Sequence, residues 1–209
     1  MADKGLLIVL SGPSGAGKGT ICKALLNRQK FWLSVSATTR EPRKGEIPEQ
    51  SYHYITKDQF KTKIKNDDFL EYAEVYGNFY GTPKSSAIEK IEKGENVILE
   101  IDIQGALKVK ENYPEGIFIF ILPPSMEELK KRIIGRGSET AESLVTRFKA
   151  AYKEVNYVSK YNYAVINDTV EEAVSKIESI IVAERCRVDR MKDKILDSKE
   201  GIIHERFYD

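Results

Sequence analysis

An α/β fold, with helices covering both faces of a parallel sheet of about five strands, is predicted by two alternating patterns. Short apolar runs rich in β-branched residues recur along the chain, as strands buried on both faces require. Stretches of helical periodicity lie between them. The expected strands are residues 6–10, 33–35, 97–101, 117–122 and 163–166. Because strands and helices alternate, the sheet is expected to be doubly wound, with ligands at the carboxyl ends of its strands.

Capping signals mark where three of the helices begin. The S/T-x-x-E/Q pattern of a capping box starts at Thr56, Ser125 and Thr169. The helix after Thr169 places apolar residues at three- and four-residue steps from 170 to about 196, interrupted by Glu184. Its first half is expected to pack on the sheet. For its second half, exposure in a monomer and contact with a second copy in a homo-oligomer are both left open.

Composition limits the class of protein. The 209 residues carry 33 basic and 32 acidic side chains, so no broad basic surface of the kind that binds nucleic acid is expected. Cys22 and Cys186 lie far apart without metal-ligand spacing, which favours two ordinary thiols in a reducing compartment. No stretch approaches the ~20 apolar residues of a membrane span, and no leader pattern opens the chain. A soluble, cytoplasmic protein without membrane contact is expected.

The segment after the first expected strand has the pattern of a phosphate-binding loop, the P-loop. It reads Gly12-Pro13-Ser14-Gly15-Ala16-Gly17-Lys18-Gly19-Thr20. Glycines permit backbone angles closed to other residues and leave the N–H groups uncovered, and Lys18 adds a positive charge for the β- and γ-phosphates. An ordinary glycine-rich turn is the alternative, but the strand before and the helical pattern after favour the loop. We expect every residue from Ser14 to Thr20 to contact nucleotide phosphates.

The end of this loop bears on the metal and the reaction. Gly19 stands where most such loops carry the Ser or Thr that binds Mg²⁺, and Thr20 lies about 100° further around the helix. Mg²⁺ is therefore expected to be carried by the nucleotide's phosphates and by waters, without a direct protein ligand. The Gly-Lys-Gly-Thr ending resembles that of nucleoside monophosphate kinases. It favours phosphoryl transfer to a second nucleotide over a GTPase switch.

Two stretches do not continue the strand and helix alternation. Residues 37–94 are dense in charge and tyrosine and too long for a structureless loop, so an inserted substrate-binding subdomain is expected there. Residues 127–156 form a charged helix–turn–helix pattern around Arg136, typical of a lid over a phosphate site. The chain from 1 to 209 is then a single domain. Its core is expected to comprise about 1–36, 95–126 and 157–209.

The insert contains a second group of residues suited to a phosphate. Arg40 and Arg43 are three positions apart, and Tyr52 and Tyr80 have phenolic hydroxyls that can donate to oxygen. Each of them alone would more often be a surface charge or a packing residue. Together they indicate a site for a phosphate monoanion or dianion.

Five ordered segments of the chain resemble the guanylate kinase family. They are Thr38-Thr39-Arg40-Glu41-Pro42-Arg43-Lys44-Gly45-Glu46, Glu71-Tyr72-Ala73-Glu74, Gly77-Asn78-Phe79-Tyr80-Gly81-Thr82-Pro83, Glu100-Ile101-Asp102-Ile103-Gln104-Gly105-Ala106 and Ile166-Asn167-Asp168. The resemblance runs from about residue 5 to 190 and departs from the usual pattern in the turn 47–52. It implies Mg²⁺-dependent transfer of the γ-phosphoryl group of ATP to GMP, and to dGMP, on a core with a GMP-binding insert and a lid.

The resemblance also implies which residues bind the acceptor. The GMP-binding set is Ser36, Arg40, Arg43, Glu46, Tyr52, Glu71, Tyr80, Thr82 and Asp102. Guanine presents N1–H and an amino group as donors and O6 as an acceptor, which suit the Glu71 carboxylate and the hydroxyls of Ser36 and Thr82. Adenine would reverse several of these partners, and sites of this sort discriminate by about 10⁴-fold.

Phosphoryl transfer requires placement and charge neutralisation more than an acid or a base. The expected catalytic residues are Lys18, Arg43, Arg136 and Arg147. Glu100 or Asp102 is expected to orient the waters of Mg²⁺. Asn167 is expected near the ATP adenine, and Arg132 either there or in an ion pair on a helix surface.

Two other functions are compatible with parts of this pattern. A monophosphate kinase for AMP, UMP or a deoxynucleotide would share the loop, but Glu71 with Ser36 and Thr82 favours guanine. A scaffold module of similar fold would bind phosphorylated peptides without catalysis. The intact glycine loop, Lys18 and the lid arginines argue against such a module.

Overall fold

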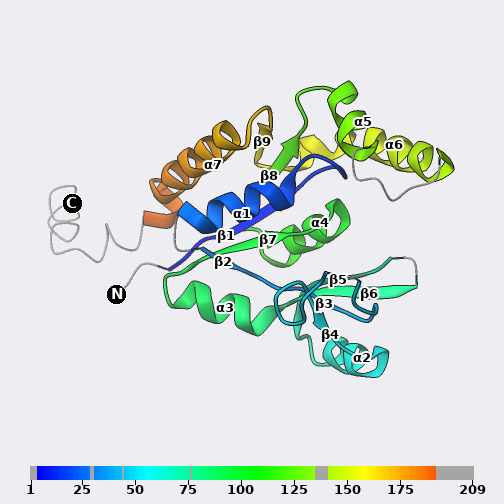
Figure 1. The fold of residues 1–209 in the computed structure, drawn as a ribbon. Helices are drawn as coiled ribbons and strands as arrows, with labels where there is room; N and C mark the ends of the chain where they lie inside the picture. Colours follow the sequence, from blue (N-terminus) through cyan, green and yellow to red (C-terminus); the bar gives the residue numbers. More distant parts are fainter. Residues whose placement is uncertain (1–3, 29–30, 44, 76, 135–140, 192–209) are drawn as a thin grey trace, which may run out of the picture.

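The structure, a computed structural model, contains a central five-stranded parallel sheet of order β2-β7-β1-β8-β9 (Figure 1). It describes residues 4–28, 31–43, 45–75, 77–134 and 141–191. The strands are β1 (Leu7–Ser11), β2 (Phe31–Leu33), β7 (Asn96–Glu100), β8 (Ile117–Leu122) and β9 (Tyr163–Ile166). Each pairs in parallel with its neighbours. The predicted fold class is confirmed.

The strand bounds follow the prediction closely, with one displacement. β8 and β9 begin and end at the predicted residues, and β1 and β7 are shifted by a single position. β2 spans Phe31–Leu33, two residues earlier than predicted. It pairs there with β7, Phe31 opposite Asn96 and Leu33 opposite Ile98. Ser34 adds one bond, from its N–H to the Ile98 carbonyl at 2.9 Å, before the chain leaves for the second sheet.

Helices cover both faces of this sheet (Figure 1). They are α1 (Lys18–Arg28), α3 (Lys84–Glu92), α4 (Ile103–Asn112) and α7 (Val170–Arg185). α1 and α7 bury Ile21 and Ile177 in one apolar cluster with one face of the strands. α3 and α4 bury Ile91 and Val109 in a second cluster with the other face. Burial on both sides explains why the strands are almost wholly apolar.

A second, smaller sheet lies within the predicted insert. Its order is β4-β3-β6-β5, and only β3 and β4 pair in parallel. The elements are β3 (Ala37–Thr38), β4 (His53–Tyr54), α2 (Lys57–Lys65), β5 (Phe69–Val75) and β6 (Asn78–Pro83). Phe60 is fully buried and stacks on Phe69 and Phe79, with ring centroids 4.5 and 5.3 Å apart. The predicted capping box at Thr56 is present in full.

The predicted lid region is helical. It contains α5 (Met126–Ile134), α6 (Ala141–Val155) and a 3₁₀ turn η1 (Asn156–Lys160). Leu129 and Ile133 of α5 are buried against Ala151 of α6. The Ser125 hydroxyl accepts the Glu128 N–H at 3.1 Å, which confirms the capping residue. In Figure 1 these helices and the small sheet lie at the same end of the central sheet as the start of α1.

The last helix is shorter than predicted. α7 begins after its Thr169 cap but ends at Arg185, and Cys186 closes it with an N–H bond to the Ala183 carbonyl. The prediction of one helix to about 196 is therefore wrong. Val188 to Met191 form a separate turn in which Val188 is 75% exposed. Among the described residues, no helix has the length and apolarity needed to cross a membrane.

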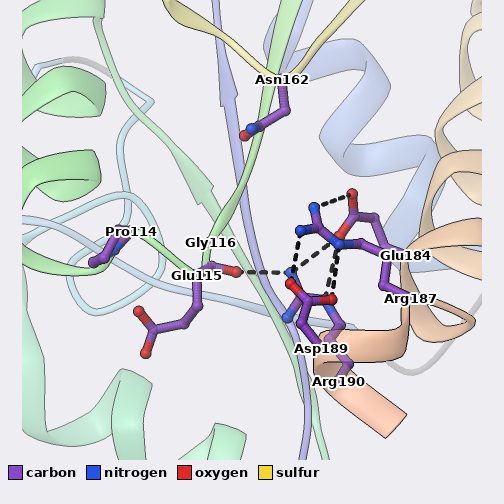
Figure 2. Close-up of a pocket in the computed structure, with 8 residues that line it drawn as sticks. All are labelled: Pro114, Glu115, Gly116, Asn162, Glu184, Arg187, Asp189 and Arg190. Atoms are coloured by element: carbon purple, nitrogen blue, oxygen red, sulfur yellow. Dashed lines mark hydrogen bonds and ion pairs between the residues drawn. The ribbon is translucent and has the colours of Figure 1, made fainter. Parts of the chain in front are cut away.

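Glu184, the residue that interrupts the apolar pattern of this helix, is buried, with 2% exposure, and held by cations. Arg190 donates to its carboxylate at 3.0 Å and Arg187 at 3.5 Å (Figure 2). The Tyr163 hydroxyl also donates to this carboxylate. A hollow of about 360 Å³ beside them is lined by Pro114, Glu115, Gly116, Asn162, Glu184, Arg187, Asp189 and Arg190. Most of its charges pair with one another, so we interpret it as an anchor for the end of α7.

Candidate active site

The phosphate loop has the conformation that its glycines predict. It joins the end of β1 to the start of α1. Gly12, Gly15 and Gly17 have φ values of 140°, 88° and 94°, a region that side chains with a Cβ rarely adopt. A Cβ at Gly12 would also lie 2.2 Å from the Ile121 carbonyl oxygen. Glycine is therefore required here by conformation and by space.

Two of the predicted nucleotide contacts lie directly behind this loop. Asn167 is 3% exposed and donates from Nδ2 to the Ala16 carbonyl at 2.8 Å. The Arg132 guanidinium donates to the Asn167 carbonyl at 3.3 Å and to Glu128 at 3.0 Å. A Cβ at Gly17 would be 2.3 Å from the Asn167 amide nitrogen. Asn167 therefore supports the loop, and Arg132 makes the ion pair that the sequence left open.

Lys18 and Ser14 engage protein atoms at the mouth of the loop. The Lys18 ammonium donates to the carbonyls of Gly12 and Pro13, at 2.6 and 3.2 Å. The Ser14 N–H donates to the Glu154 carboxylate of α6 at 3.4 Å. A phosphate entering the loop would compete with that carboxylate for the N–H.

The segment from Glu100 to Asp102 runs from the phosphate loop to the insert. A Cβ at Gly19 would lie 3.3 Å from the Glu100 carboxylate, which therefore faces the start of α1. The Ile101 N–H donates to the Leu10 carbonyl of β1 at 3.3 Å. Asp102 caps α4, accepting the Gly105 N–H at 2.7 Å. Among the described residues, no cluster of three or more His, Cys, Asp or Glu could hold a metal ion.

Three of the predicted acceptor residues lie around the guanidinium of a fourth, Arg40. Arg40 forms a two-point ion pair with Glu46, at 3.0 and 2.9 Å, and its Nε donates to the Tyr80 hydroxyl at 3.3 Å. Its guanidinium carbon lies 5.5 Å from the centroid of the Tyr52 ring. The hydrogen bonds from Arg40 and from the Arg43 N–H lower the pKa of Glu46 to about 2. Arg43 itself is exposed and is joined to this group through its backbone: its N–H donates to the Glu46 carboxylate at 2.7 Å, and its carbonyl accepts the Glu46 N–H at 3.0 Å.

Tyr54 belongs to this group although no sequence motif indicates it. Its hydroxyl donates to the Glu46 carboxylate at 2.8 Å. Tyr52 and Tyr54 are two positions apart, the spacing that places two side chains on one face of extended chain, and their rings lie 6.0 Å apart. This two-residue spacing is the sequence feature from which Tyr54 could have been predicted to lie beside Tyr52.

The predicted guanine-binding residues form a buried pair between β5 and β6. Glu71 and Thr82 face each other in register, and the Thr82 hydroxyl donates to the Glu71 carboxylate at 2.8 Å. Glu71 is 7% exposed and Thr82 is fully buried. Burial raises the pKa of Glu71 to about 7, against the opposing effect of the Thr82 hydrogen bond. Negative charge on Asp102 raises the pKa of Glu71 further.

The Glu71–Thr82 pair lies where the insert meets the core. A Cβ at Gly105 would be 3.0 Å from the Glu71 carboxylate and 3.4 Å from that of Asp102. Asn112 of α4 donates to the Leu70 carbonyl of β5 at 2.9 Å. β5 is thus fastened to the core helix that Asp102 caps.

The remaining predicted residues are less fully described. Arg136 lies outside the described residues, and Arg147 is on α6, where the structure describes its backbone only. Ser36 is half-buried and its carbonyl accepts the His53 N–H at 2.9 Å. Thr20 is exposed on α1.

A glycine loop of the P-loop pattern at the carboxyl end of a parallel sheet, with an arginine and tyrosine cluster on an inserted sheet, is the arrangement expected of a nucleotide-binding kinase. The family model of guanylate kinase matches residues 4–184. The guanylate kinase of Clostridium acetobutylicum is 79% identical over 209 residues, which is 100% of both chains. That of Clostridium tetani is 72% identical over 99% of this chain and 100% of its own.

A solved structure agrees with these sequence comparisons. The crystal structure of guanylate kinase from Anaplasma phagocytophilum matches with a TM-score of 0.78 and 34% identity, covering 95% of this chain and 97% of that one. The chain belongs to the guanylate kinase family, the ATP:GMP phosphotransferases. The family and activity that the sequence motifs implied are confirmed.

Proposed function

We propose that this chain holds ATP on the phosphate loop and GMP on the insert, and transfers the γ-phosphoryl group directly between them to give ADP and GDP. dGMP is expected to serve as a second acceptor. The buried Glu71–Thr82 pair carries the assignment of guanine, because a carboxylate can accept both N1–H and the amino group of that base.

The donor half of the reaction is assigned to the loop. The N–H groups from Ser14 to Thr20 bind the ATP phosphates, and Lys18 exchanges its bonds to Gly12 and Pro13 for phosphate oxygens. Glu100 faces the position where other loops carry a metal-binding hydroxyl, and its oxygens suit the waters of Mg²⁺. Bound with ATP, Mg²⁺ would neutralise charge on the β- and γ-phosphates.

The acceptor half is assigned to the insert. Arg40, Tyr52 and Tyr80 hold the GMP phosphate, with Glu46 fixing the Arg40 guanidinium. Arg43, with Arg136 and Arg147 of the lid, neutralises the group in transfer. Arginines in that role contribute ~10³–10⁵ in rate. Asp102, next to Glu71, borders the guanine.

Cellular location and assembly are also proposed here. Both described cysteines are free thiols, which supports a reducing, cytoplasmic location. The acceptor cluster and the loop come from a single chain, so a monomer is sufficient for the chemistry. The exposed Val188 turn offers a surface for a second copy, and sedimentation at high micromolar concentration distinguishes the two states.

A coupled ADP-release assay with GMP, dGMP, AMP, UMP and CMP tests the function. We expect turnover with GMP and dGMP, and about 10⁴-fold lower kcat/KM with AMP. In the Lys18→Ala variant, kcat should fall steeply. Near-normal kcat in that variant, or equal turnover of AMP and GMP by the native chain, would contradict the assignment.

A further inference from the structure

Tyr54 completes the set of donors around one carboxylate. The Glu46 carboxylate accepts from both terminal nitrogens of Arg40, from the Arg43 N–H and from the Tyr54 hydroxyl. The Tyr54 bond and one Arg40 bond share the same oxygen, Oε2, at 2.8 and 3.0 Å. The orientation of this carboxylate therefore depends in part on a phenol that is not itself among the proposed substrate-binding residues.

The orientation of Arg40 follows from that carboxylate. Nη1 of Arg40 donates two hydrogen bonds, one to the Glu46 carboxylate and one to the Glu41 carbonyl at 2.6 Å. Nη2 gives one N–H to Glu46, and Nε points to the Tyr80 hydroxyl. A guanidinium has five N–H donors in a fixed plane. The edge formed by Nε and Nη2, beside the Tyr80 hydroxyl, is the one that Glu46 does not cover.

We propose that Tyr54 is a positioning residue for the acceptor phosphate: it fixes the Glu46 carboxylate and so aims the Nε–Nη2 edge of Arg40 at that phosphate. The inference rests on the proposed role of Arg40 in holding GMP. Two-point recognition of a phosphate by arginine depends on the plane of the guanidinium, so a rotated Glu46 weakens it. The ring of Tyr54 packs edge-on against Tyr52, which keeps its hydroxyl in place.

The test is Tyr54→Phe, which removes one hydroxyl and keeps the ring. The KM for GMP should rise about fivefold, as the loss of one hydrogen bond implies, while kcat and the KM for ATP change less than about twofold. Tyr72→Phe on β5 is the matched control, because it makes the same change at a ring that is 41% exposed. Its KM for GMP should equal that of the native chain.

Guanosine separates positioning of the phosphate from a general effect on the insert. Guanosine competes with GMP for the same site but has no phosphate. Its inhibition constant should therefore be the same for Tyr54→Phe and for the native chain. Equal weakening of guanosine and GMP would overturn the proposal. A lower Tm with an unchanged KM for GMP would also overturn it, because the hydroxyl would then serve the fold alone.

Two further variants keep this inference distinct from the proposed function. If Arg40→Ala leaves the KM for GMP unchanged, the assignment of the acceptor site fails. If Arg40→Ala raises it and Tyr54→Phe does not, only the positioning role fails. In a Glu46→Ala background the effect of Tyr54→Phe should disappear, since the hydroxyl then has no carboxylate to hold.

Discussion

Replacing Glu71 by glutamine should stabilise the free protein while removing its preference for guanine. Glutamine keeps an oxygen for the Thr82 hydroxyl, whose bond to Glu71 is 2.8 Å long, and it cannot ionise. The carboxylate, in contrast, is buried, and its pKa rises from 4.5 to about 7. The proposed binding of guanine therefore requires an ionised group at a place where burial disfavours one.

The magnitude follows from linkage between protonation and folding. A rise in pKa from 4.5 to about 7 disfavours the ionised form by about 3 kcal/mol in the folded chain. The folded state binds this proton more tightly than the unfolded state, so stability falls as pH rises between those values and the full penalty applies above pH 7. At pH 5 the penalty is below about 1 kcal/mol.

Thermal unfolding at two pH values measures this difference. At pH 8 the Tm of Glu71→Gln should exceed that of the native chain by about 6–12 °C, and at pH 5 by far less. Glu74→Gln is the control, because Glu74 lies on the same strand with its side chain exposed. It should change Tm little at either pH.

The KM for GMP and the preference for GMP over AMP test the same reasoning in the active protein. In the native chain the KM for GMP should rise as pH falls below about 7, because a protonated Glu71 cannot accept both donors of guanine. Glu71→Gln should lose most of its discrimination between GMP and AMP. An equal Tm difference at pH 5 and pH 8, or an unchanged base preference, would refute the reasoning.

Three other substitutions test separate parts of the structure. Thr82→Val removes a hydrogen bond that lowers the Glu71 pKa, so the rise of the KM for GMP should begin at higher pH; an unmoved profile contradicts this. Gly17→Ala places a Cβ 2.3 Å from the Asn167 amide nitrogen, so the KM for ATP should rise and the Tm should fall. Glu184→Gln removes a buried carboxylate from its arginines, and denaturant unfolding should show a loss of about 1–3 kcal/mol.

The central sheet was predictable because its strands are buried on both faces, which makes apolar runs such as 117–122 unmistakable. The end of α7 was not, because the partners that make Glu184 a core residue, Tyr163 and Arg190, come together only in the folded chain. From residue spacing alone, a glutamate among apolar positions counts as an interruption of the apolar pattern.

In the candidate site, too, some features could be predicted from motifs and others depend on the folded structure. The positions of Arg40 and Glu71 were inferred from motifs, and the structure brings Arg40 to Glu46 and Glu71 to Thr82. The role of Tyr54 depends on which way the Glu46 carboxylate turns, and no motif encodes that. The pKa of Glu71 depends on how completely the strands and α4 exclude water, which is a property of packing.

The short segment from Glu100 to Asp102 connects the two proposed substrate sites. Under the proposed roles its first residue faces the donor's metal and its last borders the acceptor's base, while the middle one is pinned to β1. A strand advances about 3.3 Å per residue, so inserting one residue there would displace the two proposed sites relative to each other by about that distance, enough to take the reacting atoms out of contact. Under the proposed roles, the covalent length of this segment sets the separation of donor and acceptor, and closure of the flanking parts brings the lid arginines to the group in transfer and excludes water.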